Sequence, residues 1–146
     1  MLVNCAKSCA LLRSQEAAGS SKQQQSSSNF YSIIEKDING KDISFEQFRN
    51  KIVYIVNVAS YCGYTNENYE ILKSLSSLRS NKFEILIFPC NQFGAQEPGD
   101  ANQITNFASS RGFNGIILSK GDVNGQNTRP TFQFLKQATG KNQINW

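Results

Sequence analysis

The stretch Ile52–Ala59, IVYIVNVA, constrains the fold more than any other part of the sequence. It is rich in β-branched residues and apolar on both faces apart from Asn57. Such a run is typical of a strand buried on both sides of a sheet, as in parallel sheets covered by helices. A second strand is expected over Phe83–Phe88, FEILIF, closed by Pro89. The two runs predict the centre of an α/β domain.

Capping and stop signals place helices between and after these strands. The helix after the first strand is expected over about 66–79, capped by Thr65, with Tyr69, Leu72, Leu75 and Leu78 facing the core. The other expected elements are a hairpin with a type I′ turn at Asn39-Gly40, a short helix capped by Ser44, a helix from Asp100 to Gly112, a strand over 115–118 and a helix from Pro130 to about 138.

Composition excludes several function classes. The chain has 146 residues, which fits one domain, a net charge of +4 without a basic stripe, and no histidine. The absence of histidine removes Ser-His-Asp and Cys-His catalysis and histidine metal sites. We expect no nucleic-acid binding, no metal site and, since no run of apolar residues is long enough, no transmembrane segment.

The first residues differ from the rest of the chain. Residues 19–29, GSSKQQQSSSN, are of low complexity, and residues 1–29 are expected to be a disordered leader. Lys7 and Arg13 without an acid before Glu16 also fit a targeting segment, and both readings stay open. The folded domain is expected over residues 30–146. We expect a cytoplasmic protein, with the mitochondrion as the alternative.

One cysteine, Cys62, lies just before an expected helix start, a position that changes the acidity of a thiol. Cys62 follows the buried strand and precedes the helix start, where free N–H groups and the helix dipole favour a negative charge. This position predicts a pKa of the Cys62 thiol below its usual ~8.5 and therefore a reactive thiolate. Spacing alone equally fits an inert, buried cysteine.

Four segments carry a resemblance to a known family. The stretch Asn57–Thr65, NVASYCGYT, resembles the peroxidatic motif of the glutathione peroxidases, and Phe88–Gly99, FPCNQFGAQEPG, resembles their most distinctive signature. Asp122–Pro130, DVNGQNTRP, and the closing Trp146 after GKNQIN are further matches. Order and spacing agree from about residue 31 to the end.

The resemblance implies a thioredoxin-like fold, with a central mixed β-sheet flanked by helices and an N-terminal β-hairpin. It implies a peroxidase that reduces hydrogen peroxide and organic or lipid hydroperoxides, closest in type to the monomeric, phospholipid-hydroperoxide members. Cys62 matches the peroxidatic position, which holds selenocysteine in some members. Gln96 and Trp146 match the active-site glutamine and tryptophan. The electron donor is glutathione or a thioredoxin-type reductant as co-substrate, without a bound cofactor.

The residue types suit these roles. The amide of Gln96 and the indole N–H of Trp146 are hydrogen-bond donors, which stabilise a thiolate and the alkoxide that leaves when the O–O bond breaks. Without the resemblance, Gln96 reads as a surface loop residue and Trp146 as an aromatic packed on the core.

Two features depart from the family pattern. Ser109 occupies the position at which thioredoxin-dependent members carry their resolving cysteine. Cys90 is a possible substitute, although a buried structural cysteine is the preferred reading, and Cys5 and Cys9 are expected to reach the site only by chance. The sequence also stops at Trp146, before the asparagine, strand pair and helix that follow in the family. An unpaired sheet edge is expected there, and the alternative function is an impaired form that acts as a thiol redox sensor, relay or interaction protein.

Overall fold

In the computed structural model, which describes residues 10–12 and 29–145, the centre is a four-stranded sheet with the order β1–β4–β5–β6. Strands β4, β5 and β6 are parallel, and β1 is antiparallel to β4. Their bounds are β1 (Ala10–Leu12), β4 (Ile52–Val58), β5 (Phe83–Pro89) and β6 (Ile116–Ile117). The predicted mixed sheet with two buried central strands is confirmed.

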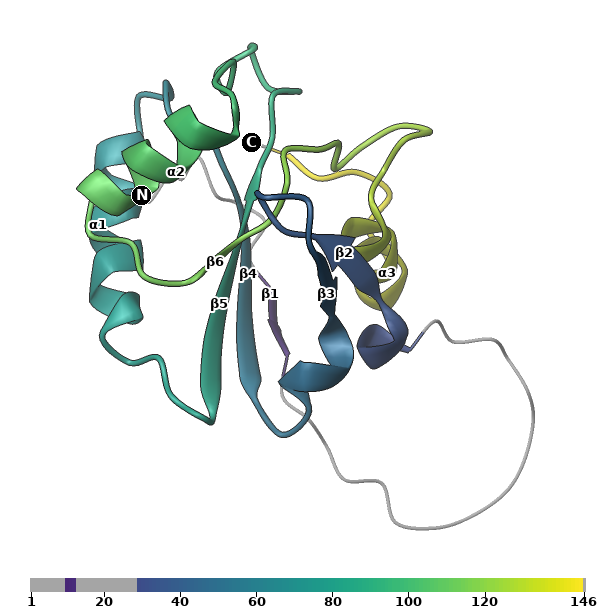
Figure 1. Ribbon diagram of the computed structural model, residues 1–146. Coiled ribbons are helices and arrows are strands. Elements are labelled where there is room, and N and C mark those ends of the chain that lie inside the picture. The colour runs from purple at the N-terminus through teal and green to yellow at the C-terminus, as the bar shows by residue number, and fades with distance from the viewer. Residues whose placement is uncertain (1–9, 13–28, 146) are drawn as a thin grey trace, which may run out of the picture.

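Helices and a hairpin cover the two faces of this sheet (Figure 1). On one face lie α1 (Thr65–Ser76) and α2 (Ala101–Ser110). On the other face lie α3 (Pro130–Thr139) and the hairpin of β2 (Ile34–Lys36) and β3 (Asp42–Ser44). Two short 3₁₀ helices, η1 (Phe30–Ser32) and η2 (Phe45–Phe48), flank the hairpin.

The alternation of side chains along β4 and β5 produces two hydrophobic clusters. Val56 and Ile87 pack with Tyr69 and Leu72 of α1 on one face. On the opposite face the cluster contains Ile55, Leu86, Phe88, Cys90, Phe132 and Leu135. Each fully buried side chain of this size contributes about 1.5–3 kcal/mol relative to an exposed one. Both central strands are thus held from two sides, which fixes where their carboxyl ends lie.

A buried ion pair joins the hairpin to the start of α3. Arg129 Nη2 donates to Glu35 Oε2 at 2.9 Å, and both side chains are less than 10% exposed. The hydroxyl of Thr131 donates to Glu35 Oε1 at 2.8 Å, and Arg129 Nη1 donates to the carbonyl of Ser119 at 2.6 Å. The carboxylate and the guanidinium are therefore both well supplied with hydrogen bonds, as buried charges must be.

Two local predictions were wrong. The hairpin loop contains one positive φ, at Gly40, instead of the two that a type I′ turn needs, because Asp37 Oδ1 accepts the N–H groups of Asn39 and Lys41 and holds a longer loop. The helix after β4 ends at Ser76, three residues early. Its expected core residue Leu78 is 61% exposed.

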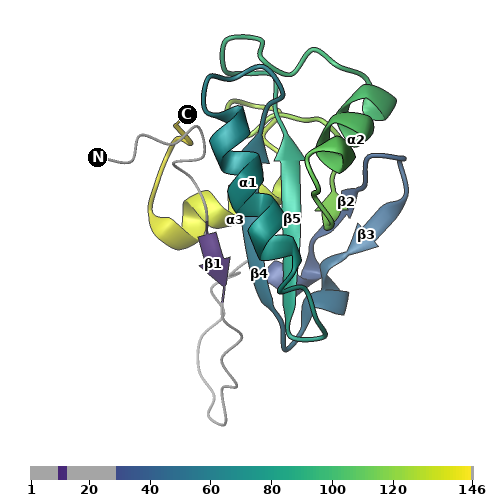
Figure 2. The ribbon, with the colours of Figure 1, turned by 90° about the vertical axis from the view of Figure 1, so that its left-hand side faces the viewer.

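Strand β1 lies along the outer edge of β4 (Figure 2). It pairs with Val53–Ile55 and covers this part of the β4 edge. The expected disordered leader over residues 1–29 falls mostly outside the described residues, and Ala10–Leu12 is its described stretch with strand structure. Among the described residues no helix has the length and apolar character that crossing a membrane requires.

Candidate active site

Cys62 lies in the turn that connects β4 to α1, at the carboxyl end of the sheet. Its side chain is half-buried, between the exposed Tyr61 and the exposed Gly63. A Cβ added at Gly63 would meet no atom within 4 Å, so the space beside Cys62 is open. The predicted position at the amino end of a helix and the predicted access from solvent are both present.

Thr65 fixes the backbone of this turn. Its hydroxyl oxygen accepts the N–H of Cys62 at 3.0 Å, and its hydroxyl donates to the carbonyl of Ala59 at 2.8 Å. The N–H of Thr65 donates in turn to the carbonyl of Cys62 at 3.0 Å. The prediction that Thr65 is the N-cap was wrong, because Thr65 is the first helical residue and the N-cap is Tyr64. The Thr65 side chain instead locks the cysteine turn.

The sulfur of Cys62 is disulfide-bonded in the structure. A disulfide sulfur has no proton to lose, so the predicted acidity of the Cys62 thiol stays a prediction.

The loop that carries Gln96 is bonded to the residues just before Cys62. The N–H of Tyr61 donates to the carbonyl of Gln96 at 3.0 Å, and the hydroxyl of Ser60 donates to Glu97 Oε1 at 2.8 Å. The amide oxygen of Gln96 is buried and accepts no hydrogen bond from the described residues. The structure therefore brings the Cys62 turn and the Gln96 loop together through two direct hydrogen bonds.

Glu97 is a fully buried carboxyl group in this loop. Burial raises its pKa above the usual value, although the hydrogen bond from Ser60 and the charge of Lys120 act in the opposite direction. The Lys120 ammonium donates to the backbone carbonyls of residues 97–99 at 3.1, 3.3 and 2.7 Å. Burial also raises the pKa of the nearby Tyr69 phenol, with the Glu97 charge as a second cause. The site is thus backed by a buried carboxyl group whose pKa is raised by desolvation.

A second set of hydrogen bonds links three motif segments. Gln92 Oε1 accepts the N–H groups of Val123 and Asn124 at 2.8 and 2.9 Å. Asn124 in turn exchanges two bonds with the backbone of Ile144, at 2.8 and 2.9 Å. The segment that leads to Trp146 is therefore tied to the same end of the sheet. Trp146 itself, a predicted site residue, lies outside the described residues.

Cys90 begins the loop after β5 and differs from Cys62. It is a free thiol with no solvent exposure, and burial raises its pKa. The preferred reading of Cys90 as a buried structural cysteine is confirmed. Ser109, at the family's resolving position, is exposed on α2.

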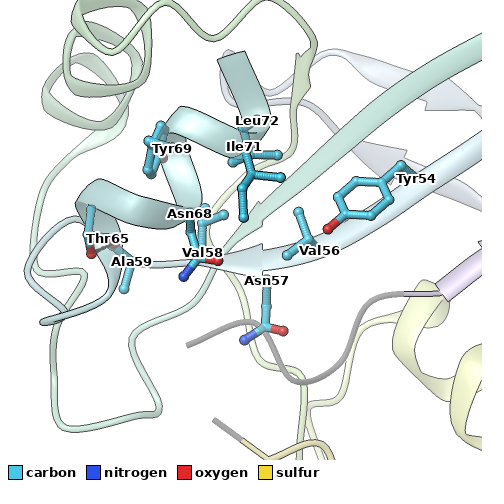
Figure 3. Close-up of a pocket in the computed structure, with 10 residues that line it drawn as sticks. All are labelled: Tyr54, Val56, Asn57, Val58, Ala59, Thr65, Asn68, Tyr69, Ile71 and Leu72. Carbon is cyan, nitrogen blue, oxygen red and sulfur yellow. Dashed lines mark hydrogen bonds between the residues drawn. The ribbon is translucent and has the colours of Figure 1, made fainter. Parts of the chain in front are cut away.

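A small cavity lies behind the cysteine turn, between α1 and β4 (Figure 3). Its lining includes Ala59 and Thr65, and its volume of about 20 Å³ is room for a single water. Asn57 contributes to the lining, and both of its side-chain polar atoms are buried without a hydrogen-bond partner among the described residues. This space is far too small to hold an organic molecule.

Sequence reasoning missed the role of the residues that hold the loops, because their hydrogen bonds run to backbone and side-chain groups between 3 and 37 residues away and follow no fixed spacing. These residues are Ser60, Thr65, Asn91, Gln92, Glu97, Lys120 and Asn124. Most of them lie inside the segments that resemble the glutathione peroxidases. That resemblance was the one signal in the sequence that could have pointed to them. Within residues 10–12 and 29–145 no cluster of side chains is arranged to hold a metal ion.

Comparisons with known proteins identify relatives of this chain. The sequence model of the glutathione peroxidase family matches residues 30–136. "Glutathione peroxidase 1, mitochondrial" from Chlamydomonas reinhardtii is 44% identical over 133 residues, which are 88% of this chain and 66% of that protein. "Phospholipid hydroperoxide glutathione peroxidase 1, chloroplastic" from Arabidopsis thaliana is 49% identical over 72% of this chain and 45% of that protein. The chain thus spans between about half and two thirds of these relatives.

Solved structures give the fold. The crystal structure of Trgpx in apo form superimposes with a TM-score of 0.60 at 26% identity, over 80% of this chain and 72% of that one. A thioredoxin-like protein from Aeropyrum pernix superimposes with a TM-score of 0.50 at 16% identity, over 62% of this chain and 63% of that one. The fold is thioredoxin-like, as expected, and the chain belongs to the glutathione peroxidase family.

Proposed function

We propose that this chain reduces hydrogen peroxide and organic or lipid hydroperoxides, with Cys62 as the peroxidatic residue and a thiol as electron donor. One observation carries the proposal. The Cys62 turn, at the amino end of α1, is hydrogen-bonded directly to the Gln96 loop through Tyr61 and Ser60, and an open space lies beside it at Gly63. Two segments that carry the family resemblance thus meet at a solvent-accessible cysteine.

The chemistry begins with the reduced thiolate. The Cys62 sulfur attacks one peroxide oxygen, the O–O bond breaks, and the products are a sulfenic acid and an alkoxide, which takes a proton to become an alcohol or water. The amide of Gln96 and the indole of Trp146 are the proposed donors to the developing negative charge. Because both groups donate hydrogen bonds, they also favour the thiolate form of Cys62.

A thiol co-substrate closes the cycle. A thiol condenses with the sulfenic acid and releases water, and thiol–disulfide exchange with a second thiol regenerates the Cys62 thiolate. Glutathione and a thioredoxin-type dithiol are the two proposed donors, and no bound cofactor takes part. We further propose that the protein works as a monomer, which size-exclusion chromatography with light scattering would check.

A stopped-flow assay of peroxide loss tests the proposal. Reduced protein is mixed with hydrogen peroxide and glutathione, and Cys62→Ser is the matched control. We expect peroxide loss in the wild type and only the uncatalysed rate in the variant. Equal rates in the two proteins would overturn the proposal.

The substrate class and the compartment are finer proposals. The name of the Arabidopsis relative includes phospholipid hydroperoxide, and the open side of Cys62 leaves room for a bulky substrate, so phosphatidylcholine hydroperoxide should be reduced as well as hydrogen peroxide. The two relatives' names place them in mitochondria and chloroplasts, which favours the mitochondrial alternative over the cytoplasm. Imaging of the protein with a fluorescent protein fused to its C-terminus would decide between these two compartments.

A redox sensor or relay is the second candidate. It is favoured because Ser109, where the family places a resolving cysteine, is an exposed serine that cannot form a disulfide. A relay would form a mixed disulfide between Cys62 and another protein while peroxide turnover with glutathione stays negligible. Measurable turnover without such a mixed disulfide would exclude it.

A further inference from the structure

The loop that carries Gln96 turns back sharply just before this residue. Gly94 and Ala95 have φ angles of +62° and +53°, both in the left-handed region. Glycine adopts this conformation freely, but alanine is strained in it, because its Cβ lies too close to the following carbonyl oxygen. A strained residue persists only where the surrounding structure holds it in place. We therefore expect firm anchors for the backbone directly after Ala95.

The side chain of Gln96 depends on this backbone for its position. A Cβ added at Gly94 would lie 3.6 Å from both Cγ and Cδ of Gln96, so the side chain folds back over its own loop. Its amide oxygen is buried and accepts no hydrogen bond within the described part of the chain. The place of the amide is thus set by the backbone at residues 96 and 97.

Glu97 anchors this backbone, because three separate segments of the chain bond to it. Its carboxyl oxygen Oε1 accepts the hydroxyl of Ser60 at 2.8 Å. Its N–H donates to Asn91 Oδ1 at 2.8 Å, and its carbonyl accepts the Lys120 ammonium at 3.1 Å. The side chain is fully buried. Among these three bonds, the one from Ser60 reaches the segment of Cys62, two residues before the cysteine.

We propose that Glu97 is a positioning residue for the reaction at Cys62, because it fixes the Gln96 amide relative to the cysteine turn. This role rests on the proposed peroxidatic function of Cys62. The acceptor oxygen of Glu97 carries the role and its charge does not, because the Ser60 hydroxyl is a neutral donor and the three bonds of Lys120 go to backbone carbonyls. Glu97→Gln should therefore keep the role, whereas Glu97→Ala should lose it.

The leaving group of the peroxide distinguishes a positioned donor from a merely intact cysteine turn. With hydrogen peroxide the thiolate displaces hydroxide, a strong base that needs a hydrogen-bond donor. With peracetic acid the thiolate attacks the terminal oxygen, the O–O bond breaks, and acetate leaves, a weak base that needs little stabilisation. In both reactions the sulfur becomes a sulfenic acid. Loss of the Gln96 donor should therefore slow the first reaction far more than the second, whereas loss of the Cys62 thiolate would slow both alike.

Two variants remove the bond between the loop and the turn. The full chain is reduced, and stopped flow follows the oxidation of Cys62 by each oxidant. We expect Ser60→Ala and Glu97→Ala to lower the rate constant with hydrogen peroxide at least about 10-fold, and that with peracetic acid less than about 3-fold. Glu97→Gln should stay within about 3-fold of the wild type with both oxidants. The control is Ser74→Ala, which should match the wild type, because this exposed hydroxyl bonds within α1, to the carbonyl of Glu70 at 2.9 Å.

A double variant tests whether Glu97 acts through Gln96. In Gln96→Ala the donor is already lost, so the further change Glu97→Ala should lower the rate constant with hydrogen peroxide by less than about 2-fold more. Two losses that multiply would mean that Glu97 acts independently of Gln96 and would overturn the proposal. Equal losses with the two oxidants in the single variants would overturn it as well.

The wild type separates failure of this inference from failure of the proposed function. If hydrogen peroxide does not oxidise Cys62 in the wild type, the proposed function is wrong and the role of Glu97 with it. If it does, and Ser60→Ala and Glu97→Ala keep the wild-type rates, the function stands and the role of Glu97 alone is wrong. Ser60→Ala removes a single oxygen atom, so the comparison remains possible if Glu97→Ala, which leaves a cavity, fails to fold.

Discussion

Cys62 and Cys90 follow neighbouring parallel strands at the same end of the sheet, yet they differ in every property that matters for reactivity. Cys62 lies four residues beyond β4 and is half-buried beside a glycine with open space around it. Cys90 comes directly after β5, has no solvent exposure, remains a thiol, and has a pKa raised by burial.

The difference shows that the strand end alone does not make a thiol reactive. The chain after β4 turns outward and starts a helix, which brings backbone N–H groups and solvent to Cys62. The chain after β5 stays inside, in the same cluster as Phe88 and Phe132. Both residues are cysteines that follow a parallel strand, so the environment of each side chain decides its chemistry.

The largest expected effect is on alkylation of the two thiols. In the reduced, folded protein we expect Cys62 to react with iodoacetamide at least about 100-fold faster than Cys90, because the buried thiol must wait for an opening of the structure. Mass spectrometry of the separate tryptic peptides measures both rates in one sample. In denaturant the two rates should become equal, and a fast native reaction at Cys90 would break the comparison.

The next largest effect is expected from removing the buried ion pair of Arg129 and Glu35. Arg129→Met removes the cation that pairs with Glu35 and whose guanidinium carbon lies 4.6 Å from the centre of the Phe88 ring. We expect the free energy of unfolding to fall by about 3–5 kcal/mol, because Glu35 is left as a buried unpaired charge. Urea unfolding measures this, and Cys90 should alkylate faster in parallel.

A matched control for this change is Lys36→Ala. Lys36 pairs with Asp42 at 2.7 Å, but both side chains are more than half exposed. Its loss should change stability by less than about 1 kcal/mol. Equal effects of the two substitutions would contradict the importance assigned to the buried pair.

Gln96→Ala tests whether Gln96 contributes to the proposed reaction at Cys62. We expect kcat/KM for hydrogen peroxide to fall about 10–100-fold, because one donor to the developing alkoxide is lost. Steady-state peroxide assays measure the change. Gln47→Ala, an exposed amide in η2, is the control and should leave kcat/KM unchanged. Unchanged activity in Gln96→Ala would remove Gln96 from the proposed site.

The smallest expected effect concerns Glu97 and pH. Because its pKa is raised in the folded protein, the folded state holds this proton more tightly than the unfolded chain. Its contribution to stability is therefore fully present below the unfolded pKa of the group and is lost as the pH rises through the folded pKa. Glu97→Gln, which keeps an acceptor for Ser60, should remove this loss and leave the variant more stable at pH 7 by about 1 kcal/mol. Urea unfolding of the wild type and the variant between pH 4 and pH 8 measures this difference. If the free energy of unfolding had the same pH dependence in both proteins, the prediction would be wrong.

The elements that the sequence predicts well are those with local signals. Strands β4 and β5 are apolar runs, α2 carries the capping box of Asp100 and Gln103, and α3 begins at Pro130 and ends at Gly140, whose φ is +65°. These signals depend on neighbours within a few residues, so the sequence alone suffices to recognise them.

Apart from the hairpin loop, the errors and omissions arise where a residue outside the element decides the structure. The helix after β4 was predicted to continue to Arg79, but the Arg79 guanidinium pairs with Glu84 at 2.6 Å and with Asn114 at 2.8 Å, outside any helix. Strand β1 has three residues and exists through its pairing with β4, more than forty residues away. The hydrogen bonds of Gln92 and Asn124 likewise join loops that are remote in sequence. Such contacts carry no periodic or capping signal.

The most direct test of the account is the reaction of the reduced protein with hydrogen peroxide as a function of pH. Stopped-flow measurement in the absence of any other thiol follows the first oxidation of Cys62. The account predicts a rate that reaches half of its maximum below about pH 8, as expected for a thiolate stabilised at a helix start, and that is absent in Cys62→Ser. A rate that still rises steeply well above pH 8, or one that survives in Cys62→Ser, would contradict it.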